Sequence, residues 1–157
     1  MGPKVLMRLF ARVLICSLLI GVSGCYFASY QDVTTDLLYS AVVNKHYRAT
    51  AKTIIHGVTM DRNYAKVLDH YSVMIVPGFG GREVLSKDEL PPGTEFQVLK
   101  VMVCTDCYLD FGERVHLVVK VTSSAAYDAA PVNVPYEYVM DSPPVFVEIP
   151  RETDKRS

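Results

Sequence analysis

The sequence predicts a mainly β fold, a small antiparallel β-barrel or sandwich that is preceded by one short helix. Five or six short runs are rich in Val, Ile and Tyr, and several of them alternate apolar and polar side chains. Proline and glycine turn signals separate these runs, and no long helical pattern lies between them. Strands without interleaved helices favour antiparallel pairing, because parallel strands need long crossover connections.

The expected helix lies in residues 32–46, DVTTDLLYSAVVNKH. Apolar side chains recur there at helical spacing, and Thr34 or Thr35 is a candidate N-cap. These apolar residues are Leu37, Leu38, Ala41 and Val42. Residues 61–71 hold a weaker helical pattern of one or two turns.

The strand candidates follow in order along the chain. They are the alternating run that begins at Tyr47 in YRATAKTIIHGV, and then residues 71–76, 94–103, 113–121, 131–140 and 144–150. Pro135 lies inside the fifth candidate, which predicts an edge strand because proline cannot donate to a central ladder. The stretch 90–98, LPPGTEFQV, resembles the start of a strand in SH3-like small barrels.

The N-terminus has the pattern of a secretory signal. Lys4, Arg8 and Arg12 precede a short apolar run that reaches Ile20, and no acidic residue occurs before Asp32. This run is well short of the ~20 apolar residues that a membrane-spanning helix needs. We therefore expect residues 1–24 to be a signal peptide.

The signal ends in Val22-Ser23-Gly24-Cys25, which resembles the bacterial lipobox. The resemblance implies that a peptidase cleaves before Cys25 and that its thiol carries diacylglycerol, with an acyl chain such as palmitate on the freed amine. Valine stands at position 22, where leucine is commoner. Tyr26 follows the cysteine in place of the aspartate that retains such lipoproteins in the inner membrane, so the resemblance points to the outer membrane, facing the periplasm.

Three other interpretations of the N-terminus are open. An uncleaved anchor is disfavoured by the length of the run, and ordinary secretion would need a closer A-x-A match. N-myristoylation needs Ser or Thr where Leu6 stands. A lipoprotein is the best-supported of these interpretations, with residues 25–31 as a lipidated tether.

Cleavage would leave 133 residues, enough for one domain with a real core over residues 32–150 and a charged tail over 151–157. Three of the 16 basic residues lie in the signal, so the mature chain has 13 against 17 acidic residues, a net charge of about −4. A mildly acidic chain with interspersed charges argues against nucleic-acid binding.

Cys104 and Cys107 are the cysteines that remain besides the lipidated one. A structural disulfide that closes the connection between two strands is the first interpretation, because disulfides persist outside the cytoplasm. A thioredoxin-like redox pair would sit at a helix N-terminus, for which the following YLDFGERV leaves no room. A zinc site would need more ligands, and His46, His56, His70 and His116 are scattered, as single surface histidines commonly are.

Motifs for catalysis or cofactors are not recognised in the mature sequence. The loop PGFGGR at 77–82 lacks the spacing of a dinucleotide fingerprint or P-loop, and neither a nucleophile elbow nor an S-x-x-K pair occurs. We expect no catalytic residue, no metal ligand and no cofactor other than the covalent lipid. The expected role is a non-catalytic binding or assembly module that meets an envelope protein through loops 77–93 and 104–113. The alternative is a tethered thiol-disulfide or metal-handling protein that uses Cys104 and Cys107.

Overall fold

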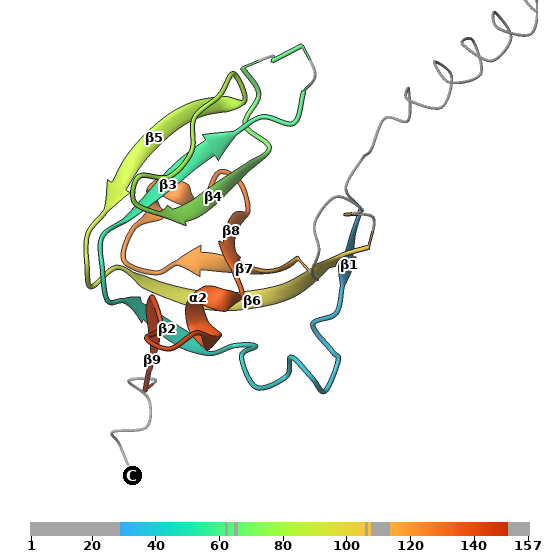
Figure 1. Cartoon of the computed structure of the whole chain (residues 1–157), viewed down its shortest axis with the longest axis vertical. Helices are drawn as coiled ribbons and strands as arrows, with labels where there is room; N and C mark the ends of the chain where they lie inside the picture. Colours follow the sequence, from blue (N-terminus) through green and yellow to red (C-terminus); the bar gives the residue numbers. More distant parts are fainter. Residues whose placement is uncertain (1–28, 62, 65, 106, 108–113, 151–157) are drawn as a thin grey trace, which may run out of the picture.

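The computed structural model describes residues 29–61, 63–64, 66–105, 107 and 114–150, and within these ranges the chain is mainly β (Figure 1). Nine strands form one mixed sheet that is not closed. The strands are β1 Tyr30–Asp32, β2 His46–Ala49, β3 Thr53–Val58, β4 His70–Ile75, β5 Val84–Leu90, β6 Glu95–Cys104, β7 Val115–Val121, β8 Val132–Pro135 and β9 Phe146–Ile149. The short helices are the 3-10 turn η1, Ala125–Tyr127, and α2, Glu137–Met140.

The strand order is β5-β3-β4-β8-β7-β6-β2-β9, and β1 also pairs with β6. All pairs are antiparallel except β4 with β8, where Tyr71 lies opposite Val132. The expectation of a purely antiparallel sheet is therefore wrong. The parallel pair arises because β8 enters the sheet between β4 and β7 after a long connection, and it is antiparallel to β7.

The core collects side chains from both halves of the sheet. Ile55 and Val73 come from β3 and β4, and Leu117 comes from β7. Phe96 of β6 packs on Phe146 of β9 with ring centroids 4.9 Å apart, and both rings are almost fully buried. Burial of these apolar surfaces provides most of the stabilisation that holds the strands together.

The helix expected over residues 32–46 is not confirmed. Residues 34–44 form successive turns, and the amides of Asp36, Tyr39, Val42 and Lys45 each donate to the carbonyl three residues before. Both ends of the segment bond to β6, Val33 to Val101 and Asn44 to Val98. A straight helix over this segment would hold its ends about 16 Å apart, whereas the two β6 residues are separated by about 10 Å.

The β1–β2 connection is thus a loop between two short strands, β1 and β2, that pair with the same side of β6. β1 pairs with the end of β6 and β2 pairs with its start. β6 itself has an irregular register between Val98 and Lys100, beside the insertion. Tyr30 and Gln31, expected in the tether, belong to β1.

The alternating run that begins at Tyr47 forms two strands, not one. β2 ends at Ala49 and β3 begins at Thr53, so the chain leaves β6 and β9 and crosses to β4 and β5. β2 keeps the alternation that the sequence indicates, whereas β3 is buried on both faces and is not the half-buried strand that the pattern predicts. A periodic pattern fixes which residues face the core, but it does not show where a strand changes partners.

The expected strand 131–140 is a strand only as far as Pro135, and α2 follows it. The expectation of an edge strand is also wrong, because β8 lies between β4 and β7. Pro135 is the last residue of β8, where a missing amide donor does not interrupt the ladder. In the described part of residues 61–71, before β4 begins at His70, there is no helix.

β5 was expected to be part of a loop spanning 77–93, and this expectation is wrong. It pairs with β3 from Val84 to Leu90. Its middle residues, SKDE, are polar and exposed because β5 is the terminal strand of the sheet. Charged side chains are common on such strands, since they discourage pairing with other chains.

Candidate functional site

A groove of about 440 Å³ lies at one end of the sheet, where β5 turns into β6. Leu90, Thr94 and Val121 are buried at this groove, and the exposed Pro92 and Ser123 also line it. The complete lining is Glu89, Leu90, Pro91, Pro92, Gly93, Thr94, Val121, Ser123, Ser124 and Tyr127. We call this the groove end of the sheet.

The β5–β6 turn at the groove has the geometry that its Pro-Pro-Gly sequence favours. The amide of Thr94 donates to the carbonyl of Pro91 at 3.2 Å, and Gly93 has a φ of +90°. This is the pattern of a type II turn, which favours proline at its second position and needs glycine at its third. The turn that the sequence marks with Pro-Pro-Gly therefore forms a wall of the groove.

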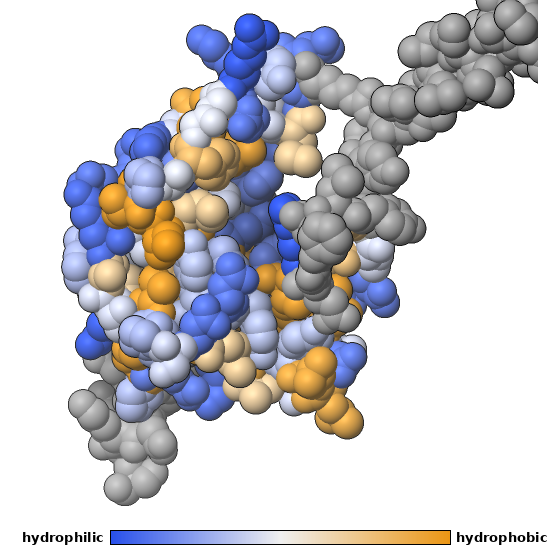
Figure 2. Space-filling view, in the orientation of Figure 1, coloured by the Kyte–Doolittle hydropathy of each residue, from blue (hydrophilic) through white to orange (hydrophobic). Residues whose placement is uncertain are grey.

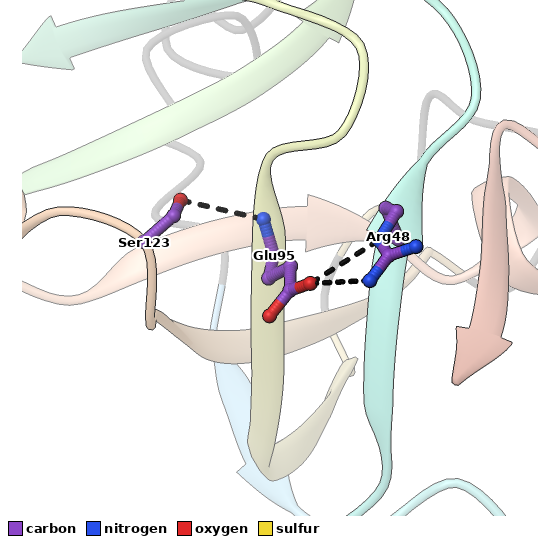
Figure 3. Close-up of polar contacts among 3 residues, drawn as sticks. All are labelled: Arg48, Glu95 and Ser123. Atoms are coloured by element: carbon purple, nitrogen blue, oxygen red, sulfur yellow. Dashed lines mark hydrogen bonds and ion pairs between the residues drawn. The ribbon is translucent and has the colours of Figure 1, made fainter. Parts of the chain in front are cut away.

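Ion-pair and hydrogen-bond contacts brace the start of β6 beside the groove (Figure 3). Oε1 of Glu95 accepts from Nη2 of Arg48 at 2.6 Å and from Nε at 3.2 Å. The amide of Glu95 donates to Oγ of Ser123 at 3.4 Å. β2, β6 and the turn after β7 are thus joined at one point.

Tyr127 forms the other side of the groove. Ser124 caps the short helix η1 by accepting the amide of Ala126, which places Tyr127 at its last position. The Tyr127 ring meets Tyr71 edge to face with centroids 5.3 Å apart. Burial raises the pKa of the Tyr127 hydroxyl, and the charge of Asp88 adds to the effect, so the phenol stays protonated at neutral pH.

Several polar groups of the groove already have partners within the protein. Oγ1 of Thr94 donates to the carbonyl of Pro91, and Glu89 forms an ion pair with Lys52. The remaining surface is largely proline, leucine, valine and a tyrosine ring. Such a surface suits van der Waals contact with an extended apolar segment, and nothing in the lining resembles a nucleophile with its base.

The opposite end of β6 holds the cysteine pair. Cys104 is the last residue of β6, and Cys107 lies at disulfide distance from it, with 5.9 Å between Cα atoms. Cys104 also pairs with Tyr30 of β1. Cys104 ends a strand, and the described residues 104, 105 and 107 are not helical, whereas a thioredoxin-like pair sits at a helix N-terminus.

His116 lies beside this end of β6 and contacts Tyr30 edge to face at 4.6 Å between ring centroids. Burial lowers its pKa to about 4, and the nearby His70 adds to the shift. Burial also lowers the pKa of His70 itself. Both rings are therefore neutral at pH 7. We call this region, with Cys104 and the start of β1, the tether end.

His56 differs from the single surface histidine that the sequence suggests. It is fully buried, and neither ring nitrogen has a hydrogen-bond partner among the described residues. Phe79 stacks on the ring at 4.4 Å between centroids. Gly78, with a φ of +72°, lies so close that a Cβ there would stand 2.4 Å from Cε1 of His56. Gly78 of the PGFGGR loop thus allows the loop to pack closely on His56.

The structure covers the expected site residues unevenly. Cys25 and most of loop 104–113 lie outside the described residues, and Cys104 and Cys107 lie together as the spacing suggests. The expected loop 77–93 has three parts. Phe79 stacks on His56, residues 84–90 form β5, and residues 89–93 line the groove. The groove itself was missed, because Val121 and Tyr127 join the turn only through the pairing of distant strands. The Pro-Pro-Gly signal indicated only a turn.

The described residues contain no group of three or more side chains suited to hold a metal ion, and none of their helices has the length and apolar character to cross a membrane. Comparison with protein-family models, curated proteins and solved structures found no match for this chain.

Proposed function

We propose that this protein is a non-catalytic binding or assembly module, anchored in a bacterial envelope membrane by lipid on Cys25. The groove would hold an extended apolar segment of another envelope protein. One observation carries the proposal, namely that the chain enters the fold at one end of β6 and the groove lies at the other.

The separation follows from the register. Tyr30 lies opposite Cys104 at the last residue of β6, and the groove includes Thr94, one residue before the first. Ten residues of extended strand span about 30 Å. Ser29 is fixed by Thr105, whose amide donates to its carbonyl at 2.8 Å. A lipid on Cys25 would therefore hold the tether end at the outer membrane and present the groove to the periplasm.

The proposal includes a finer fold class, that of a small barrel or sandwich. The core cluster draws Ile55 and Val73 from one half of the sheet and Phe96 and Leu117 from the other. Shared burial of this kind supports a strongly curved sheet that wraps one core.

The anchor is tested by the intact mass of protein extracted from membranes. A mass that matches residues 25–157 plus acyl groups is expected, and Cys25→Ser should leave the chain unprocessed or release it from the membrane. An unlipidated mature chain in the membrane fraction would contradict the anchor.

The groove is tested by a photo-crosslinking residue at Ser123, which lines it. Lys120, exposed near the end of β7 just before the turn that contains Ser123 but outside the groove, is the matched control. An adduct with an envelope protein is expected at position 123 alone, and Tyr127→Ala should abolish it while the protein stays folded. Equal adducts at both positions would contradict binding in the groove.

The alternative function, thiol-disulfide exchange or metal handling, is kept because Cys104 and Cys107 lie together at a partly exposed strand end. The double replacement by serine discriminates between the two roles. Loss of the cellular phenotype in a variant that still folds and still crosslinks at position 123 would favour the working pair. A structural pair predicts lower stability and an intact phenotype.

A further inference from the structure

We propose that the tip of the β1–β2 connection, Leu37 and Leu38, inserts into the lipid surface that carries the anchor. These two side chains are 89% and 71% exposed. Figure 2 shows apolar surface where this connection protrudes at the lower right of the molecule. The inference rests on the proposed lipidation of Cys25 and adds a second membrane contact to it.

The tip is held in a defined conformation. Tyr39 and Val42, next in the same loop, are buried, and the Tyr39 ring packs against Tyr136 edge to face at 5.6 Å. Oδ1 of Asp36 accepts the amide of Leu38 at 2.9 Å, and Oγ of Ser40 donates to the carbonyl of Leu37 at 2.9 Å. The loop therefore exposes two leucines while it buries its other large apolar side chains.

The tether length places the tip within reach of the anchored membrane. Tyr30 is the fifth residue after Cys25, and an extended chain of five residue steps spans at most about 18 Å. β1 carries the chain only about 10 Å further before the loop begins at Val33. A short tether of this kind brings the edge of the domain near the bilayer, so an apolar tip on that edge can contact acyl chains.

The chemistry of the tip fits a lipid interior and gives no sign of headgroup attraction. The basic side chains next to the loop are already paired, Lys45 at its end with Glu148 at 2.6 Å and Lys100 of the neighbouring β6 with Asp32 at 3.2 Å. Contact would depend on burial of the leucines, and added salt should not weaken it. The anchor itself would carry two or three acyl chains, and burial of the leucines beside it would add apolar contact that further slows exchange of the protein between membranes.

The chain has no tryptophan, so a single indole can report the environment of the tip. The full lipidated protein carrying Leu38→Trp is reconstituted into phosphatidylethanolamine and phosphatidylglycerol vesicles with brominated acyl chains. Ile75→Trp is the matched control, because Ile75 is 50% exposed and pairs with Thr53, which also pairs with Leu90 of the groove. We expect blue-shifted, quenched emission from position 38 and unquenched emission from position 75.

A second variant measures the consequence for anchoring. Leu37→Ser with Leu38→Ser should speed transfer of the lipidated protein between vesicles by about tenfold or more, since burying one leucine corresponds to roughly that factor. Met140→Ser, at a similarly exposed apolar position, should leave transfer unchanged. Emission from position 38 that stays unquenched in a protein of lipidated mass overturns the tip insertion and leaves the anchor standing. An unlipidated mass refutes the anchor itself.

Discussion

The two ends of β6 are stabilised in different ways. At the groove end, Phe96 and Val98 are each 1% exposed, with β2 on one side of the strand and β7 on the other. At the tether end, β1 has three exposed residues, Val103 is only half-buried, and the cysteine pair closes the strand. Apolar burial thus dominates one end, and a cysteine pair at disulfide distance with neutral aromatic and imidazole contacts lies at the other. The comparison indicates that a disulfide occurs where the core is thin.

The largest expected effect comes from the groove end. Phe96→Ala should lower the free energy of unfolding by about 3–5 kcal/mol, because it leaves a cavity against Phe146. Val103→Ala at the tether end should cost about 1–2 kcal/mol, since that side chain only borders the core. Chemical denaturation of both variants measures the difference, and equal losses would break the comparison.

Replacing both Cys104 and Cys107 by serine should cost about 2 kcal/mol, the loop-closure entropy of a four-residue loop. The measurement is denaturation of the wild type and the variant without reductant. Crosslinking at Ser123 should persist, because the groove lies at the other end of β6. If stability is unchanged, the pair contributes nothing to folding, and the tether end must be supported by its other contacts.

The tether end should also be the acid-sensitive end. The pKa of His116 is about 4 in the folded protein and about 6.5 in the unfolded chain, so between these values the unfolded state binds more protons. Stability from this neutral ring is complete above pH 6.5 and is lost as pH falls toward 4. With allowance for partial exposure, the loss is about 1–2 kcal/mol.

Thermal or chemical denaturation across this pH range measures the effect. His116→Gln removes the titrating ring, so the difference between wild type and variant isolates its contribution from those of the carboxylates. A difference that does not change with pH would show that His116 keeps its ordinary pKa in the fold.

The smallest effect concerns the ion pair beside the groove. Arg48→Ala should change stability by less than about 1 kcal/mol, because both partners are partly exposed to water. Arg48→Lys is the matched control, since it keeps the charge and loses the two-nitrogen contact. A loss of stability above 2 kcal/mol would mean that the Arg48–Glu95 ion pair is needed to hold β6 in place.

The amino-acid pattern by itself determined much of the strand content. β4, β6, β7 and β9 lie within a residue or two of their expected bounds, because each is a local run of β-branched and aromatic side chains between turn signals. The short spacing of Cys104 and Cys107 likewise indicated a local link. Lipidation of Cys25 stays a prediction from the N-terminal pattern.

Tertiary structure decided the rest, since strand partners and edge positions depend on residues far apart in the chain. The sequence of β5 is too polar to be recognised as a strand, and it becomes one because its backbone pairs with β3. Residues 34–44 have a helical pattern, yet bonds to β6 at both ends force them into turns. The groove forms because the β5–β6 turn, the end of β7 and η1 lie side by side. Local periodicity carries no information about contacts between such distant segments.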